Sequence, residues 1–161
     1  MKSLILFFFF FSVFCAFIVH FFIDLDFQIL PNGVNLYLAI VFLSYSLFFH
    51  PWPHWLWGGI LGFSIPYSIT WVFYKLRGKI GMGGGDIKLY GALGLYLGPE
   101  QIVVTLFLSC FLGSLAGLIF IGLRKMKRET PMAFGPFIII AASLQIFFPH
   151  FQKYLMTIVF Q

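Results

Sequence analysis

Acidic side chains, and charges in general, are scarce in this sequence. Only five of the 161 residues are Asp or Glu and 9% are charged, whereas 61% are hydrophobic and 22% are aromatic. Soluble domains carry about 25% charged residues, so this composition excludes an ordinary soluble domain and indicates a chain that lies in a bilayer. The chain is too short to combine a membrane bundle with a large soluble domain. We therefore expect one integral-membrane domain over residues 1–161.

Cysteine and histidine are also too sparse to form a recognisable metal-binding pattern. Cys15 and Cys110 fall inside apolar segments without metal-ligand spacing, and we interpret them as small packing residues. The four histidines are scattered along the chain: His20, His50, His54 and His150. We interpret them as packing or interfacial residues. The sequence also has no P-loop and no Ser-His-Asp order. We expect neither a metal nor a cofactor.

Long apolar segments, by contrast, are abundant. Six of them approach the length of about 20 residues that a helix needs to cross the hydrocarbon core: residues 3–23, 34–49, 55–76, 87–97, 102–123 and 133–148. We therefore expect an all-α, polytopic membrane protein with about six transmembrane helices. The fourth segment is short, and short segments at membrane depth are tolerated where they line a water-filled cavity or are covered by protein. This segment is therefore predicted to lie beside a site.

The positions of Lys and Arg predict the orientation, because positive residues in short loops stay on the cytoplasmic side. Eight of the ten basic residues share one side of the predicted topology: Lys75, Arg77, Lys79, Lys88, Arg124, Lys125, Lys127 and Arg128. The loop that we expect over residues 24–32 falls on the same side, and both termini face out. This topology, together with anionic membrane lipid, accounts for the net charge of +5. No nucleic-acid partner is expected.

Three of the five acids then lie at the cytoplasmic rim: Asp24, Asp26 and Asp86. Each has a simple interpretation as a helix cap or a water-facing residue. For Asp86 this interpretation is incomplete, because three glycines directly precede it: Gly83, Gly84 and Gly85. Consecutive glycines let another backbone approach closely or allow positive φ. We expect an extended peptide to lie there.

Two facing carboxylates suit peptide hydrolysis by a shared water. Like charges close together do not both ionise readily, so one carboxyl keeps its proton while the other acts as general base. We therefore interpret the 24–26 region and Asp86 as a catalytic pair. Lys88 would stabilise the ionised form of Asp86 or orient the substrate, and Asp26 would tune Asp24. The alternatives are that Lys88 serves topology and that Asp26 is a helix-end residue.

The motifs around these acids resemble those of the type IV prepilin peptidases, membrane aspartic proteases of the GxGD class. Residues 22–32 resemble the first aspartate motif of that family, an Asp followed by an apolar-Pro-Asn turn, and residues 79–88 match the second. Residues 130–137 resemble a late segment of the bacterial branch. The resemblance implies that Asp24 and Asp86 are the catalytic residues, with Asp26 as a neighbour.

The resemblance also implies a substrate and a location. Family members remove a short basic leader from type IV prepilins and type II secretion pseudopilins at the cytoplasmic face of the bacterial inner membrane. Many carry a further N-terminal region with a cysteine-rich loop associated with N-methylation. This sequence has no paired CxxC, so we expect peptidase activity without methyltransferase activity. A truncated copy of a longer gene is the alternative, and the oligomeric state is not indicated.

Two other functional classes remain as alternatives. A small membrane transporter or ion-relay component would use Asp24 and Asp86 as intramembrane acids, although both lie near one rim and no internal repeat is present. A non-catalytic assembly factor would tolerate substitution of Asp86. Two pairs of glycines, at 94 and 98 and at 113 and 117, have spacings that let helices approach closely. They would serve either internal packing or docking of a substrate helix.

Overall fold

The computed structural model describes residues 2–78, 81–123 and 132–148. These residues form five helices: α1 (Lys2–Phe27), α2 (Asn32–Phe49), α3 (Trp52–Arg77), α4 (Gly84–Gly122) and α5 (Gly135–Phe147). The described ranges contain no strand. Helices α1 to α4 are long and apolar enough to cross a membrane. The all-α class predicted from the sequence is confirmed, whereas the number of about six spans stays a prediction.

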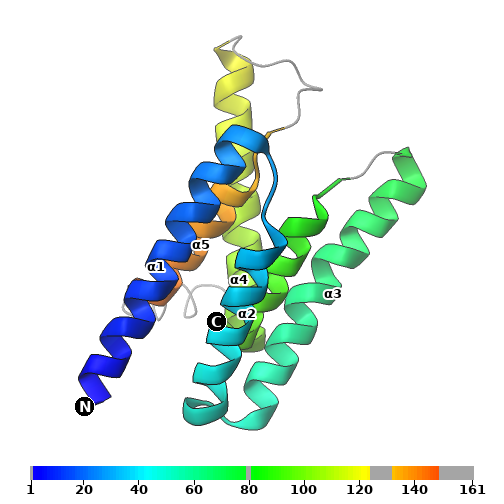
Figure 1. Ribbon diagram of the computed structural model, residues 1–161. Coiled ribbons are helices and arrows are strands. Elements are labelled where there is room, and N and C mark those ends of the chain that lie inside the picture. The colour runs from blue at the N-terminus through cyan, green and yellow to red at the C-terminus, as the bar shows by residue number, and fades with distance from the viewer. Residues whose placement is uncertain (1, 79–80, 124–131, 149–161) are drawn as a thin grey trace.

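Helix α4 is two helical segments that fold back on each other. The backbone leaves the helical conformation at Gly98, with φ 80° and ψ 179°, and Pro99 follows. The hydroxyls of Tyr90 and Ser109, 19 residues apart, are hydrogen-bonded to each other. In a straight helix these residues would be about 28 Å apart. The turn therefore separates two antiparallel halves (Figure 1), as predicted by the break between segments 87–97 and 102–123.

Helix α3 packs against the first half of α4 through glycines. A Cβ atom at Gly58 would overlap the carbonyl oxygen of Gly94, and one at Gly98 would overlap the imidazole of His54. Gly98 also needs its positive φ, which side chains rarely adopt. The predicted small-residue spacing at 94 and 98 therefore serves internal packing. Gly113 likewise packs against the ring of Phe134.

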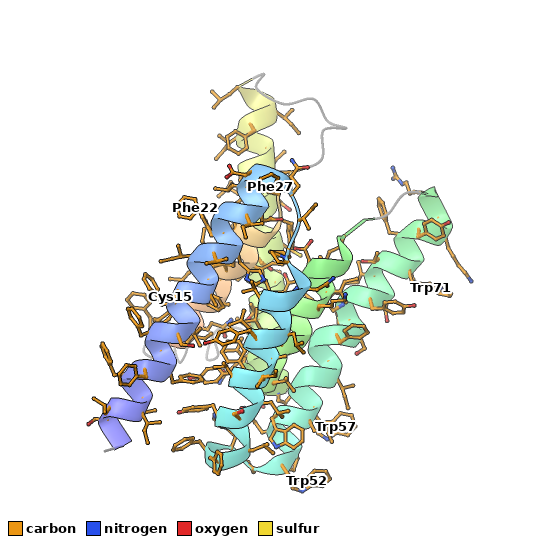
Figure 2. All side chains as sticks on the ribbon, in the orientation of Figure 1. Cys15, Phe22, Phe27, Trp52, Trp57 and Trp71 are labelled. Atoms are coloured by element: carbon orange, nitrogen blue, oxygen red, sulfur yellow. The ribbon has the colours of Figure 1, made fainter. Side chains whose placement is uncertain are left out.

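The core of the bundle lies between α1, α2, α4 and α5. Its large, fully buried members include Phe42, Leu89, Tyr90, Leu93 and Ile138. The outer surface is equally apolar, with many exposed Phe, Leu and Trp side chains. Figure 2 shows labelled aromatic side chains directed away from the bundle, at both of its ends. Such a surface suits contact with lipid rather than water.

The polar ends of four helices meet at one end of the bundle. Figure 1 shows the C-terminal end of α1 there, with the N-terminal ends of α2, α4 and α5. Three basic residues belong to helix ends on this side: Lys75 and Arg77 at the end of α3, and Lys88 at the start of α4. The other five basic residues of the predicted cytoplasmic side lie outside the described residues: Lys79, Arg124, Lys125, Lys127 and Arg128.

Helix α1 runs further than the apolar pattern predicted. The expected first span ends at residue 23, but the helix continues to Phe27. It stops at Gln28, which has a φ of 54° and donates its backbone N–H to the carbonyl of Asp24. Asp24 and Asp26 therefore lie in the last turns of a helix, and the expected loop begins only after them. The helix continues because every residue from 24 to 27 can extend it at little cost.

Candidate active site

Asp24 is held at the start of α5 by a backbone hydrogen bond. Its side chain is only 4% exposed, and its Oδ2 accepts the N–H of Gly135 at 2.8 Å. The first N–H groups of a helix have no partner within the helix and attract negative charge, so a carboxylate satisfies them well. A Cβ at Gly135 would lie 2.7 Å from Oδ2 of Asp24. Glycine is therefore required for this approach.

Asp86 is the third residue of α4, and it caps that helix. Its carboxylate accepts the backbone N–H of Gly83, the residue before the helix. This is one of the two hydrogen bonds of a capping box, in which the side chain at the third helical position accepts the backbone N–H of the residue before the helix. The side chain is 9% exposed. Its Oδ1 is buried and has no hydrogen-bond partner among the described residues.

The structure brings Asp24 and Asp86 together from different helices. The two carboxyl groups are close enough for their charges to interact. Each is fixed by one backbone N–H at a helix N-terminus, and Oδ1 of Asp86 is left without a partner within the described part of the chain. Two neighbouring carboxyls in a poorly solvated site share a proton more easily than they carry two charges. The arrangement can therefore supply one acid and one base.

The three glycines before Asp86 differ in their surroundings. A Cβ at Gly85 would lie 2.8 Å from the Cβ of Leu30, so this glycine lets the loop between α1 and α2 press against the start of α4. Gly83 precedes the helix with extended φ and ψ and is exposed. Gly84 is exposed with open space beside it. One of the three therefore has a packing role, and the other two face the surroundings beside Asp86.

A buried histidine and a buried asparagine connect the two helices that carry the aspartates, and no sequence motif predicts this connection. His20 Nε2 lies 2.9 Å from Oδ1 of Asn35, and Nδ2 of Asn35 donates to the carbonyl of Gly85 at 3.1 Å. Both side chains are buried. The one local signal was spacing, because His20 precedes Asp24 by four residues and so shares its helix face. No local pattern distinguishes Asn35.

Two residues predicted to support the site are not part of its buried centre. Lys88 is exposed, and its Nζ donates to Oδ1 of Asn32 at 2.7 Å. It thereby ties the start of α4 to the start of α2. Asp26 is exposed near the end of α1, two residues from Asp24 and hence on another face of the helix. Among the described residues, no three His, Cys, Asp or Glu side chains are grouped as metal ligands would be.

Sequence comparison decides the family. The profile of the Type IV leader peptidase family matches residues 9–118, which include both Asp24 and Asp86. The chain belongs to this family. The match ends before Gly135, so the backbone contact to Asp24 comes from outside the matched residues.

Three relatives illustrate how this leader peptidase family member compares with longer proteins. It is 35% identical over 122 residues to a prepilin leader peptidase/N-methyltransferase of Stutzerimonas stutzeri, covering 74% of this chain and 42% of that protein. The proteins of the same name from Aeromonas salmonicida (strain A449) and Legionella pneumophila are 36% and 31% identical, covering 78% of this chain in both cases and 44% and 45% of those proteins. The match thus spans less than half of each relative. No solved structure matches this chain.

Proposed function

We propose that this chain is a membrane aspartic endopeptidase that removes the short basic leader from type IV prepilins and type II secretion pseudopilins. One observation carries the proposal: two buried carboxyl groups, from α1 and α4, interact where four helix ends meet. Membership of the leader peptidase family, and relatives named prepilin leader peptidase/N-methyltransferase, support the choice of substrate.

In the proposed mechanism, Asp24 and Asp86 share one proton around a water molecule. The ionised carboxylate takes a proton from the water, whose oxygen attacks the scissile carbonyl carbon. The protonated partner donates its proton to the carbonyl oxygen, which gives a tetrahedral diol. The carboxyl that took the water proton then passes it to the leaving amine as the C–N bond breaks, while the other carboxylate takes back a proton from a hydroxyl of the diol. The backbone N–H groups of Gly135 and Gly83 hold one oxygen of each carboxyl in place. Such preorganisation aligns the reacting atoms before the reaction begins.

In this proposal the chain lies in the bacterial inner membrane, and the site faces the cytoplasm. Lys75, Arg77 and Lys88 support this orientation, because they are at the same end of the bundle as the two aspartates, and positive residues are retained on the cytoplasmic side. A prepilin leader is itself basic and would reach the site from that side. The exposed Gly83 and Gly84 offer backbone beside Asp86 along which an extended peptide would lie.

Mass spectrometry of a co-expressed prepilin tests the proposal. The chain and a leader-bearing prepilin are produced in the same membranes, and the mass of the pilin is compared for wild type, Asp24→Asn and Asp86→Asn. Loss of the leader with wild type alone supports the aspartate pair. Glu100→Gln is the matched control, since this acid is exposed next to the Gly98 turn, and it should cleave normally. Leader removal by both Asn variants would contradict the mechanism.

A further inference from the structure

We infer that His20 is a positioning residue: through Asn35 it holds the start of α4, and so sets where Asp86 lies relative to Asp24. The inference rests on the proposed peptidase function and extends it to two residues that need not touch the substrate. His20 belongs to the same helix as Asp24, and Asn35 to α2. The contact on α4 is the carbonyl of Gly85, the residue directly before Asp86.

The geometry makes this a continuous link across three helices. His20 is completely buried, and Asn35 is buried beside it. The ring Nε2 lies 2.9 Å from Oδ1 of Asn35, and Nδ2 of Asn35 lies 3.1 Å from the carbonyl oxygen of Gly85. Buried polar groups that satisfy each other fix their neighbours in one arrangement. The link therefore couples the last turns of α1 to the first turn of α4.

The direction of each hydrogen bond is fixed by chemistry. The carbonyl of Gly85 can only accept, so the nitrogen of the Asn35 amide must face it and the amide oxygen must face His20. That oxygen also only accepts, so the Nε2 of His20 must carry a proton. The role therefore requires an N–H donor at the tip of residue 20. An apolar side chain there would leave the amide oxygen buried without a donor, at a cost that favours rotation of the amide.

Loss of the link should affect the chemical step more than substrate binding. Gly85 already packs against Leu30, so the start of α4 would stay near the loop but would lose the bond that sets its position. Displacing a reacting group by about 1 Å can cost about 10²-fold in rate. The residues that would face the leader, Gly83 and Gly84, make no part of this link. A fall in kcat with little change in KM is therefore expected.

The kinetic test compares two substitutions at residue 20 in the full chain, in detergent, with a purified prepilin. His20→Leu removes the donor and should lower kcat at least about tenfold with KM within about twofold. His20→Gln keeps an N–H at a similar reach and should stay within about threefold of wild type. Wild-type kcat in His20→Leu would overturn the inference. So would an equal loss in both variants when both remain folded by thermal unfolding.

Substitution of Asn35 tests the same link independently. Asn35→Asp removes the donor to Gly85 but keeps an oxygen toward His20, and it should lower kcat as His20→Leu does. The double variant His20→Leu/Asn35→Asp should lose no more than the larger single loss, because both changes break one link. Additive losses would contradict a shared link. If His20→Leu does not fold, Asn35→Asp and His20→Gln still decide the matter.

Spin labels separate failure of this inference from failure of the proposed function. Labels at Phe27→Cys and Gly84→Cys, both exposed positions, report the separation of α1 and α4 by electron paramagnetic resonance after Cys15 and Cys110 are replaced by Ala. A narrow separation that broadens in His20→Leu and is restored in His20→Gln supports the link, whether or not the wild type cleaves a prepilin. An unchanged distribution in all variants would overturn it.

Discussion

Two buried polar clusters in this bundle differ in what their side chains can do. The acid cluster at the helix ends contains Asp24, Asp86, His20 and Asn35. The neutral cluster lies between the two halves of α4 and α5 and contains Tyr90, Thr105, Ser109 and Gln145. Each cluster includes one buried oxygen that has no partner among the described residues: Oδ1 of Asp86 and Oε1 of Gln145. An unpartnered oxygen alone therefore does not distinguish a reactive site.

The neutral cluster holds helices together. Nε2 of Gln145 in α5 donates to Oγ1 of Thr105 in α4 at 2.6 Å, and the hydrogen bond between the hydroxyls of Tyr90 and Ser109 joins the two halves of α4. Interhelical hydrogen bonds of this kind in membranes contribute about 0.6 kcal/mol on average. The acid cluster, by contrast, contains two carboxyl groups that can ionise, and Asp24 accepts a backbone N–H at the start of a helix. Charge and placement, rather than burial, separate the two clusters.

Removing an acid should produce the largest difference between the clusters. We expect Asp86→Asn to lower prepilin cleavage at least about 10³-fold, because the pair loses a group that can give or take a proton. The amide has nearly the same shape, so the fold should be kept. The measurement is cleavage of purified prepilin followed by mass, with thermal unfolding as the check on folding. Residual cleavage within about tenfold of wild type would remove Asp86 from the mechanism.

The next largest effect is expected from crowding Asp24 without changing any acid. In Gly135→Ala the new Cβ would lie 2.7 Å from Oδ2 and 2.9 Å from Cγ of Asp24. The carboxyl must move, and we expect a loss of about 10²-fold in kcat. Gly117→Ala is the matched control, since its nearest neighbour would be 3.9 Å away. Equal rates for the two variants would show that the position of Asp24 is not critical.

Changing the neutral cluster should alter stability slightly and activity hardly at all. Gln145→Leu removes an amide whose Oε1 has no partner within the described ranges. The lost bonds to Thr105 and to the carbonyl of Gln101 are partly offset by removal of the unpartnered oxygen, so we expect a change in the free energy of unfolding of less than about 1.5 kcal/mol. Urea or thermal unfolding in detergent measures it. A loss of kcat comparable to that of Gly135→Ala would mean that the clusters are coupled.

The smallest effect is expected at the exposed acid next to the site. Asp26 lies on another face of α1 from Asp24, and charges exposed to water interact weakly. We expect Asp26→Ala to keep kcat and KM within about twofold of wild type. Comparing cleavage rates at two salt concentrations checks the result, because a surviving electrostatic role would depend on salt. A large loss of kcat in Asp26→Ala would show that Asp26 contributes to the active site.

Much of the fold could be predicted because it depends on properties of single segments. The excess of apolar residues indicates membrane helices, and their lengths indicate where helices run. The Gly98-Pro99 pair marks the break in α4. Segment ends were less predictable: α1 continues through Asp24 to Phe27 because a few polar residues can extend a helix that apolar residues began. Hydrophobicity reports contact with lipid, and a helix does not have to end where that contact ends.

The candidate site could be predicted only where its residues form local motifs. Asp24 and Asp86 each lie in such a motif, and the structure brings them together. Gly135 lies in the predicted motif over residues 130–137, but it contacts Asp24 across 111 residues of sequence, and that contact is not predicted by any local pattern. Lys88 is two residues from Asp86 in the sequence, and its amine donates to Oδ1 of Asn32 in α2, a partner that sequence proximity does not indicate. Contacts that form when helices pack together cannot be predicted from the sequence of any single segment.

The turn in α4 limits what topology mapping can reveal about how this chain crosses a membrane. A segment that turns back at Gly98 contributes an even number of crossings, either two or none, because it leaves on the side where it entered. Its first half, 84–97, would extend only about 21 Å against a hydrocarbon thickness of about 30 Å. Reporter enzymes fused beyond Leu123 would therefore give the same answer in both cases. Only a depth-sensitive probe at the turn itself would tell a full hairpin from a re-entrant loop.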